Sequence, residues 1–394
     1  MRYYVAPNGT GNASSWASAG DLQNTLALIL ASPSRGGDEI WAAGDNNVLG
    51  ATHQGQYNLT APLVINNNTE PLSIYGGFVG REAYLCQRNA NIVSNDPANV
   101  PDFFQNPSIL DGGNTNRVIE MSQANVFLID GFVIQNGNAG TGLSDGGGVH
   151  ANGQNLRFEN LVIMDNTAGR NGGGMYTAAM LNLMIKNTIF FNNQATNNGG
   201  GIWIGDGDNQ ILVNVLFNNN QTNGGNGNAI FVTPDPYNVK IINNTIAGNT
   251  GSSASTPSVY CDRPLHVDIY NSIIYPDILA ATGGTPFANV RVDYCLLSNL
   301  IPFAILQNPN GINPPLPPAP PVNPLFVNQA SLSAGGDYHL QPTSPCIDEG
   351  STNLIFPLSA TDLEGKPRFI DKGMGTPPSF PTIKVIDMGA FEVQ

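Results

Sequence analysis

Short stretches in which apolar and polar residues alternate recur along the middle of this chain. Between residues 155 and 231 one pattern is written three times, as LRFENLVIMDNTAGRNGGGMY, LMIKNTIFFNNQATNNGGGIW and ILVNVLFNNNQTNGGNGNAIF. Its pivot asparagines, Asn160, Asn187 and Asn214, stand 27 residues apart. The same frame continues in both directions, with further pivots at Gly131, Asn244, Asn271 and Tyr294. A repeat of this length indicates a solenoid, in which each unit packs on the next.

Two apolar columns of the repeat show which kind of solenoid to expect. Two residues before the pivot stand Ile129, Phe158, Ile185, Leu212, Ile242, Ile269 and Val292, and two residues after it stand Val133, Val162, Ile189, Leu216, Ile246, Ile273 and Leu296. Alternation with many β-branched residues predicts strands, and asparagines and glycines mark the bends between them. We therefore predict an all-β chain, folded as a single right-handed parallel β-helix with the pivot asparagines in an internal ladder.

The two ends of the chain depart from the repeat. A run resembling a capping box, Ser18 to Asp21, precedes a helical apolar face formed by Leu22, Leu26, Ile29 and Leu30. We expect this helix to cover the open end of the core. The predicted organisation is a cap and first coil at 1–45, a β-helix at 46–307 with a long loop at about 76–111, and a proline-rich connection followed by an irregular closing segment at 308–394.

Composition excludes some classes of partner. Charged residues make up only 11% of the chain, against about 25% in typical soluble domains. Amides replace them, because the chain holds 51 asparagines and 45 glycines. The net charge of −14 opposes binding to nucleic acid, and no apolar run is long enough to span a membrane. The four cysteines lack metal-binding or redox spacing, and we expect buried free thiols, with a disulfide as the alternative.

One further column carries candidate chemistry. Its alternation places Val149, Met175, Ile202, Ile230 and Val259 inward, so that the next residue of each coil points outward. These outward residues form what we call the ring column: His150, Tyr176, Trp203, Phe231 and Tyr260. An exposed aromatic row suits the apolar faces of sugar rings or a flat protein partner. Alternatively, the rings stack on one another and only cover the strand beneath.

Acidic residues are expected near the same column, at Asp145, Asp165, Asp206 and Asp208. We include Asp165 and Asp206 in the candidate ligand-binding site. The pair Asp206 and Asp208 offers hard oxygen ligands for calcium, although an Asp-Gly-Asp run is equally typical of a solvated turn. No other cofactor is indicated.

The residues point only weakly to catalysis. A polysaccharide lyase would need a base beside calcium-binding carboxylates, and a glycoside hydrolase would need two carboxylates roughly 5–10 Å apart. Glu159 and Lys186 occupy one column in adjacent units, so an ion pair accounts for both. Nothing in the sequence marks Asp165 and Asp206 as a catalytic pair.

A charged phrase near the end, DLEGKPR (362–368), has the composition of a site but lies among turn-forming residues. We interpret it as structural, with Arg368 anchoring Asp362 or Asp387 across a terminal coil.

Phrases at the two ends carry a family resemblance. YYVAPNGTGN, GDEIWAAG, LSIYGGFVGRE, NPLFVN, DYHLQPTSPCIDEGS, DLEGKPR and IDMGAFE follow one another in this order. Together they resemble the choice-of-anchor Q family, secreted right-handed parallel β-helix proteins mainly of Bacteroidota. The resemblance implies a pectate-lyase-like superhelix and an extracellular or cell-surface location. It implies no particular activity.

Three functions remain open at this point. The first is a non-catalytic adhesin or glycan-binding module, expected to be monomeric, that binds a polysaccharide or a protein through the ring column. The second is a polysaccharide lyase or glycoside hydrolase with a weakly marked site, and the third is a structural spacer.

Overall fold

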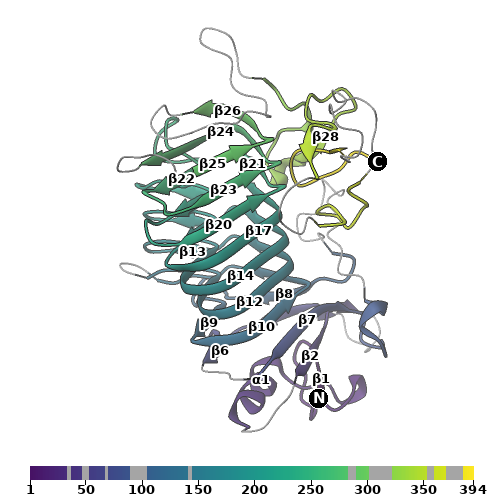
Figure 1. Ribbon diagram of the computed structural model, residues 1–394. Helices are drawn as coiled ribbons and strands as arrows, with labels where there is room; N and C mark the ends of the chain where they lie inside the picture. Colours follow the sequence, from purple (N-terminus) through teal and green to yellow (C-terminus); the bar gives the residue numbers. More distant parts are fainter. Residues whose placement is uncertain are drawn as a thin grey trace.

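The chain forms a parallel β-helix, which confirms the predicted fold class. The computed structural model describes residues 1–32, 37–46, 53–66, 70–88, 104–140, 144–282, 290–300, 322–352, 359–369 and 385–394. Coils stack from the N-terminal end upward, and each pairs in parallel with the next (Figure 1). No helix among these residues is long and apolar enough to cross a membrane.

Three full coils at the centre show how one turn is built. β14 (Met175–Phe191) lies between β12 (Val149–Met164) and β17 (Gly207–Asn218). The first three residues of β14 pair with β16 (Ile202–Ile204), which precedes β17 in the same coil. Left-handed backbone at Ala179 and Asn187, with φ of 48° and 49°, bends β14 into straight stretches. A short strand and a glycine-rich turn then return the chain to the next coil, through β13 (Thr167–Ala168), β15 (Gln194–Ala195) and β18 (Gln221–Thr222).

The remaining strands extend this stack. Before the central coils lie β1 (Arg2–Val5), β2 (Asp38–Ala43), β3 (Asp45–Asn46), β4 (His53–Gln54), β5 (Gln56–Asn58), β6 (Leu63–Asn66), β7 (Leu72–Phe78), β8 (Ser108–Asp111), β9 (Ile119–Ser122), β10 (Ala124–Asp130) and β11 (Phe132–Gln135). After them lie β19 (Ile230–Val232), β20 (Tyr237–Ile242), β21 (Thr245–Ala247), β22 (Val259–Asp262), β23 (Val267–Tyr270), β24 (Ile273–Thr282), β25 (Val290–Asp293) and β26 (Leu296–Leu300). The loop predicted at 76–111 begins inside β7 and ends inside β8, and residues 89–103 lie outside the described part of the chain.

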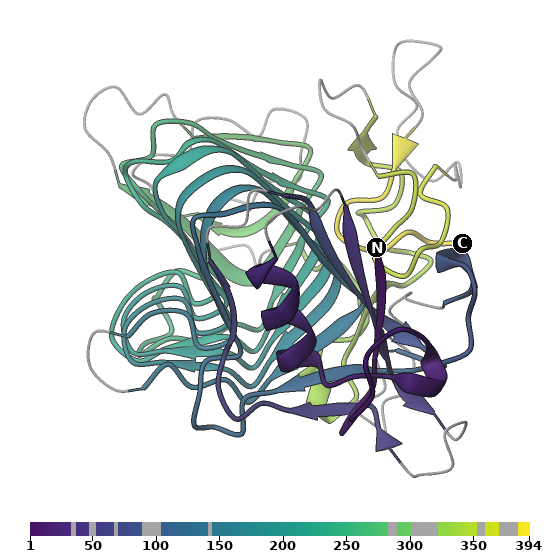
Figure 2. The ribbon, with the colours of Figure 1, turned by 90° about the horizontal axis from the view of Figure 1, so that it is seen from below.

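The N-terminal helix covers the open end of the core, as predicted. In α1 (Leu22–Ala31), Leu22, Leu26 and Ile29 belong to the hydrophobic cluster that fills the coils. Figure 2 shows the helix lying across the end of the stack. The cap is simpler than the predicted capping box, because Asp21 is the N-cap and its carboxylate accepts from the backbone N–H of Asn24 at 2.8 Å.

The predicted pivot frame is wrong by one residue in one coil. Val213 pairs with Ile242 and Leu216 pairs with Thr245, so the residue opposite Asn214 is Asn243, not Asn244. The two apolar columns therefore run through Ile241 and Thr245 at this level. The coil from 214 to 243 spans 29 residues instead of 27, and the extra residues shift the alternation that the sequence pattern follows.

The pivot asparagines do form a ladder, but on the outside of a corner, so the prediction of an internal ladder is wrong. Asn187 donates its side-chain N–H to Oδ1 of Asn160 at 3.1 Å, and Asn214 donates to Asn187 at 3.0 Å. Phe158 and Leu161 on either side of the Asn160 corner face the core. The positive φ of Asn160, 51°, allows two successive residues to stay outside between them.

A different column supplies the internal ladder, and we call it the inner amide ladder. It consists of four fully or almost fully buried asparagines: Asn166, Asn193, Asn220 and Asn249. Asn193 is typical, since it donates to the carbonyl of Ile163 at 2.8 Å and to Oδ1 of Asn220 at 2.9 Å. Its own Oδ1 accepts from the backbone and side-chain N–H groups of Asn166. Every polar atom of the side chain is thereby satisfied in the core.

The closing segment packs against the side of the β-helix and not across a terminal coil. The column two residues after the pivot, which includes Val162, Ile189 and Leu216, faces outward. Its side chains form a second hydrophobic cluster with the closing segment. The segment contributes Leu332, Tyr338, Leu340, Cys346, Ile347, Leu363, Met388, Ala390 and Phe391. Its strands are β27 (Phe326–Asn328), β28 (Asp337–Leu340), β29 (Gly350–Ser351) and β30 (Val385–Ile386), and Figures 1 and 2 show it beside the coils.

The charged phrase DLEGKPR belongs to this lateral packing. Arg368 is fully buried, donates to the carbonyl of Ala390 at 2.7 Å and pairs with Glu392 at 3.5 Å. Asp362 accepts from the backbone N–H groups of Glu364 and Glu392. Arg368 is structural, as predicted, but its ion-pair partner is Glu392 and not the predicted carboxylate of Asp362 or Asp387, and the packing lies on the side of the solenoid. The predicted proline-rich connection lies mostly outside the described residues.

All four cysteines are free, and the prediction of buried thiols is confirmed for three of them but not for Cys86. Cys261, Cys295 and Cys346 are buried and Cys86 is exposed. Burial raises the pKa of the Cys261 and Cys295 thiols to about 12, so both are protonated packing groups.

The inner amide ladder predicts a large cost for a single change. Asn193→Ala removes four hydrogen bonds inside the core and should lower the free energy of unfolding by about 3–5 kcal/mol. Asn192→Gly is the matched control, because Asn192 is exposed and its φ of 53° suits glycine. We expect the control to lose about 1 kcal/mol or less in urea unfolding. Equal losses of unfolding free energy for the two variants would show that the inner amide ladder stabilises the fold no more than the exposed asparagine does.

Candidate functional site

The ring column lies on successive coils, in register. His150 pairs with Tyr176, Tyr176 with Trp203, Trp203 with Phe231, and Phe231 with Tyr260. Their neighbours Val149, Met175, Ile202, Ile230 and Val259 are fully buried, so the predicted inward and outward assignment is correct. Glu120 of β9 precedes His150 in the same column. The column therefore begins with a charge and continues with rings.

The rings stack on one another along the solenoid axis. Tyr176 and Trp203 have centroids 4.2 Å apart at an interplanar angle of 9°, and His150 lies 5.1 Å from Tyr176 at 8°. Phe231 and Tyr260 form a second pair at 5.4 Å. Because stacked coils place ring face against ring face, the column presents mainly ring edges to solvent.

Two residues of the column depart from the expectation of an exposed ridge. Phe231 is only 7% exposed and belongs to the buried residues. Trp203 lies over Gly205, where an added Cβ would come within 2.3 Å of its ring. His150, Tyr176, Trp203 and Tyr260 are half-buried.

An ion pair between Arg117 and Glu120 lies at the N-terminal end of the ring column, beside His150. Arg117 pairs with Glu120 and donates to the carbonyl of Gly146 at 2.8 Å. Nδ1 of His150 lies 3.2 Å from Glu120, in a direction that makes no hydrogen bond within the described residues. Burial lowers the pKa of His150 to about 4, and the charge of Arg117 acts in the same direction. His150 is therefore a neutral ring at neutral pH and stacks as one.

Two of the predicted acidic residues lie near the ring column: burial raises the pKa of Tyr176, and the carboxylates of Asp145 and Asp206 act in the same direction. Asp145 is buried and held by Arg170 and the backbone N–H of Asn171. Asp165 is half-buried and accepts from Asn192 in an outer amide ladder, and burial raises its pKa. Asp206 and Asp208 are exposed. No group of three or more His, Cys, Asp or Glu side chains that could hold a metal ion occurs in the described ranges.

Glu159 makes a different ion pair from the one expected. It stands opposite Lys186 in the register, but its carboxylate pairs with Arg157, two residues earlier on the same strand. The predicted contact between Glu159 and Lys186 is replaced because Arg157 reaches the same outer face.

An exposed aromatic residue that the repeat pattern did not predict, Tyr237, lies in the coil after β16 and β17. Tyr237 is 59% exposed and pairs in register with Asp208, which in turn pairs with Leu181. Leu181 is 44% exposed, and Leu265, in the following coil, is 49% exposed. Within the described residues no ring stacks on Tyr237, and the side chain is largely exposed to solvent. Its signal in the sequence is an aromatic residue at the first position of a strand, β20, outside the apolar columns of the repeat.

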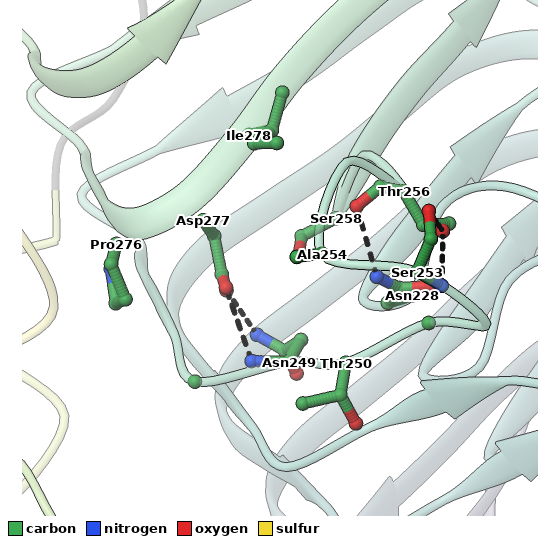
Figure 3. A pocket seen from close by; sticks show the side chains of 12 residues that line it. Asn228, Asn249, Thr250, Ser253, Ala254, Thr256, Ser258, Pro276, Asp277 and Ile278 are labelled. Carbon is green, nitrogen blue, oxygen red and sulfur yellow. Dashed lines mark hydrogen bonds between the residues drawn. The ribbon is translucent and has the colours of Figure 1, made fainter.

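A buried carboxylate that sequence analysis also missed ends the inner amide ladder. Asp277 accepts from the side-chain N–H of Asn249 at 2.7 Å and from its backbone N–H at 3.2 Å (Figure 3). Ser258 and the backbone of Gly248 also act to lower its pKa. Burial is the larger influence and raises the pKa of Asp277 to about 6, whereas these hydrogen bonds lower it. The ladder spacing could have identified this residue, because Asp277 follows Asn249 by 28 positions.

The raised pKa of Asp277 predicts a pH-dependent difference between two proteins. Asp277 in the folded state holds its proton up to about pH 6, while the unfolded chain loses it near 3.8. Its contribution to stability is therefore present below pH 4 and is lost as pH rises through 6. Asp277→Asn removes this titration, so the variant should gain about 3 kcal/mol relative to the parent between pH 4 and pH 7.

Urea unfolding of both proteins across this pH range measures that difference. Other shifted groups, such as His150 and Glu392, titrate in both proteins and cancel in the comparison. Asp206→Asn, at an exposed position, should show no such trend. A constant difference between parent and Asp277→Asn would show that the pKa of Asp277 is not raised.

The ring column predicts an order of stability losses. Ile202→Ala opens a cavity in the core and should cost about 2–4 kcal/mol. Trp203→Ala removes a half-buried ring and its stack on Tyr176, and should cost about 1–2 kcal/mol. Thermal or urea unfolding of the two variants tests the order, and a larger loss for Trp203→Ala would contradict it.

Comparison with known proteins places the fold. The sequence matches no protein-family model and no curated protein. Among solved structures, the chain is similar to the pectate lyase Pel9A, with 13% sequence identity, a TM-score of 0.52, and coverage of 93% of this chain and 96% of that chain. It also matches a pectin methylesterase from Aspergillus niger at 11% identity over 78% of this chain and 82% of that chain, but the TM-score of 0.32 is too low to carry an argument. The chain thus has the right-handed parallel β-helix fold that the pectate lyase Pel9A displays.

Proposed function

We propose that this protein is an exported, cell-surface or extracellular β-helix of the choice-of-anchor Q type that binds a neutral polysaccharide without cleaving it. The binding surface is the corner between β16 and β17. It includes the ring edges of Tyr176 and Trp203 on one side and the exposed ring of Tyr237 on the other. Asp206 and Asp208 follow Trp203 in the same coil, and Asp208 is in register with Tyr237.

The exposure of the Tyr237 ring is the observation that carries this proposal. A sugar ring presents an apolar C–H face to an aromatic ring, and its hydroxyls then need polar partners around the rim. Asp208 stands next to Tyr237 in the register. A separate column of asparagines, distinct from the ladder of Asp165, runs beside Asp208. In it Asn182 donates to Asn155 at 2.9 Å and Asn209 donates to Asn182 at 3.0 Å. Aromatic face, carboxylate and amides are the groups that a neutral glycan requires.

Charge favours a neutral chain over a polyuronate. The protein carries a net charge of −14, and the two carboxylates of the corner, Asp206 and Asp208, are exposed. A polyanion approaching this surface would meet like charge. This argues against binding of the substrate class named for pectate lyases, although the fold is the same.

Binding measurements on a panel of polysaccharides test the proposal. We expect neutral galactan, mannan or xyloglucan to be retained in affinity electrophoresis, and polygalacturonate to be retained much less. Tyr237→Ala should weaken binding roughly thirtyfold, because an aromatic contact of this kind contributes about 2 kcal/mol or more.

A matched control separates the corner from aromatic exposure in general. Tyr84 is 68% exposed near the N-terminal end, and Tyr84→Ala should leave binding unchanged. Retention of polygalacturonate alone would refute the proposal. Release of reducing ends or unsaturated products from any bound polysaccharide would refute its non-catalytic part.

A further inference from the structure

The coils carry a side lobe that ends abruptly. In each central coil, one segment connects the end of the long strand (β12, β14 or β17) to the ring-column strand of the next coil (β14, β16 or β19). We call this segment the lateral lobe, and it contains β13, β15 or β18. Ile246 pairs with Ile274 and Val259 pairs with Leu279, so residues 247–258 of one coil face only residues 275–278 of the next. Twelve residues are therefore covered by four, and the end of the lobe stays open.

A pocket of about 340 Å³ occupies this open end. Asn249 and Asp277, the last members of the inner amide ladder, form part of its wall, and the exposed turn through Ser253 and Ala254 forms another part (Figure 3). The volume is at the lower end of the range for small-molecule sites in proteins. Its size suits one small ring with substituents and not an extended chain.

The walls are of two chemical kinds. Pro276, Ile278 and Ala254 supply apolar surface, and Figure 3 shows Pro276 and Ile278 on the strand that passes above the turn. Hydroxyls and amides supply the rest, from Asn228, Asn249, Thr250, Ser253, Thr256 and Ser258. A pyranose has the same division, with C–H faces and a rim of hydroxyls that both donate and accept.

The charges of the pocket lining restrict the class of ligand to neutral molecules. Among the described residues, Asp277 is the one charged residue that lines the pocket, and no Lys, Arg or His of this part of the chain lines it, so an anionic ligand finds no counter-charge there. The Asp277 carboxylate already accepts hydrogen bonds from the backbone and side-chain N–H groups of Asn249. It is therefore a poor partner for a cation, since binding one would require those hydrogen bonds to be given up.

We propose that this pocket binds a single neutral pyranose unit, with its C–H face against Pro276 and its hydroxyls on Thr250, Ser253 and the neighbouring amides. The inner amide ladder, ended by Asp277, holds the pocket wall rigid from below. The ligand class rests on the proposed function, but the pocket is a separate site from the corner that carries Tyr237. Its occupant is one sugar residue and not a polysaccharide surface.

Calorimetric titration of the full chain with small sugars tests this. The probes are the methyl glycosides of glucose, galactose and mannose, with galacturonic acid, glucosamine and glycerol for comparison. At least one neutral glycoside should bind with a dissociation constant of about 1 mM or lower. Galacturonic acid and glucosamine should bind at least about tenfold more weakly, since their charges lack partners in the pocket.

Blocking variants locate the binding. Ala254→Trp places a large ring into the pocket from an exposed turn and should raise the dissociation constant of the glycoside at least about tenfold. Ser253→Trp provides a second block if the first variant folds poorly, as judged by its melting temperature. Ser252→Trp is the control, because Ser252 is exposed on the same turn but does not line the pocket.

The outcomes separate this site from the corner. Loss of glycoside binding in Ala254→Trp, with polysaccharide binding intact, supports the pocket whatever Tyr237→Ala does. The proposal is overturned if no neutral glycoside binds below about 10 mM, if both blocking variants bind like the parent, or if glycerol binds as tightly as the sugars.

Discussion

In-register stacking of parallel coils is the constraint on which this structure depends. Each side chain lies about 4.8 Å from its equivalent in the next coil, so a column is stable only if its residue type can pack against itself. Aliphatic residues and rings meet this condition, as Phe190 on Phe217 shows at 4.8 Å. Asparagine meets it through one donor and one acceptor group, as in the links from Asn193 to Asn220. Like charges do not, which explains why only 11% of the residues are charged and amides replace them.

In the three ladders that contain a carboxylate, the direction of the hydrogen bonds decides where that carboxylate lies. A side chain that only accepts hydrogen bonds can stand only at the accepting end. The pivot ladder passes hydrogen bonds toward the N-terminus and begins at Asp130, which accepts from Asn160 at 2.8 Å. A second outer ladder begins at Asp165, which accepts from Asn192. The inner amide ladder runs the other way and ends at Asp277. Buried or half-buried carboxylates thus mark ladder ends, which are also places where the repeat is interrupted.

The same constraint moves candidate function away from the regular columns. Rings that stack in register satisfy one another, so Tyr176 and Trp203 offer edges more than faces. Groups available to a ligand occur where a column changes type or a coil changes length. Tyr237 is exposed because Asp208 and not another ring stands beside it. The pocket at the end of the lateral lobe exists because residues 275–278 replace a longer loop.

The amino-acid sequence by itself determined the repeat, the strand class and the parallel stacking, because a 27-residue period with alternating apolar residues has few other solutions. It also determined which residue of the pair Ile202 and Trp203 faces the core, since alternation is a local property. Only the tertiary structure decided where the asparagines point. Asn160 and Asn166 look alike in the sequence, yet one lies outside a left-handed corner and the other inside the core. The column from Val162 to Leu216 reads as core in the sequence, but it is buried under the closing segment, a contact between residues far apart along the chain. Coil length was equally decisive, since two extra residues moved the pivot to Asn243 and a shortened coil opened the pocket beside Asp277. Local pattern records which residues alternate, whereas register between coils and packing across the chain determine what each of them touches.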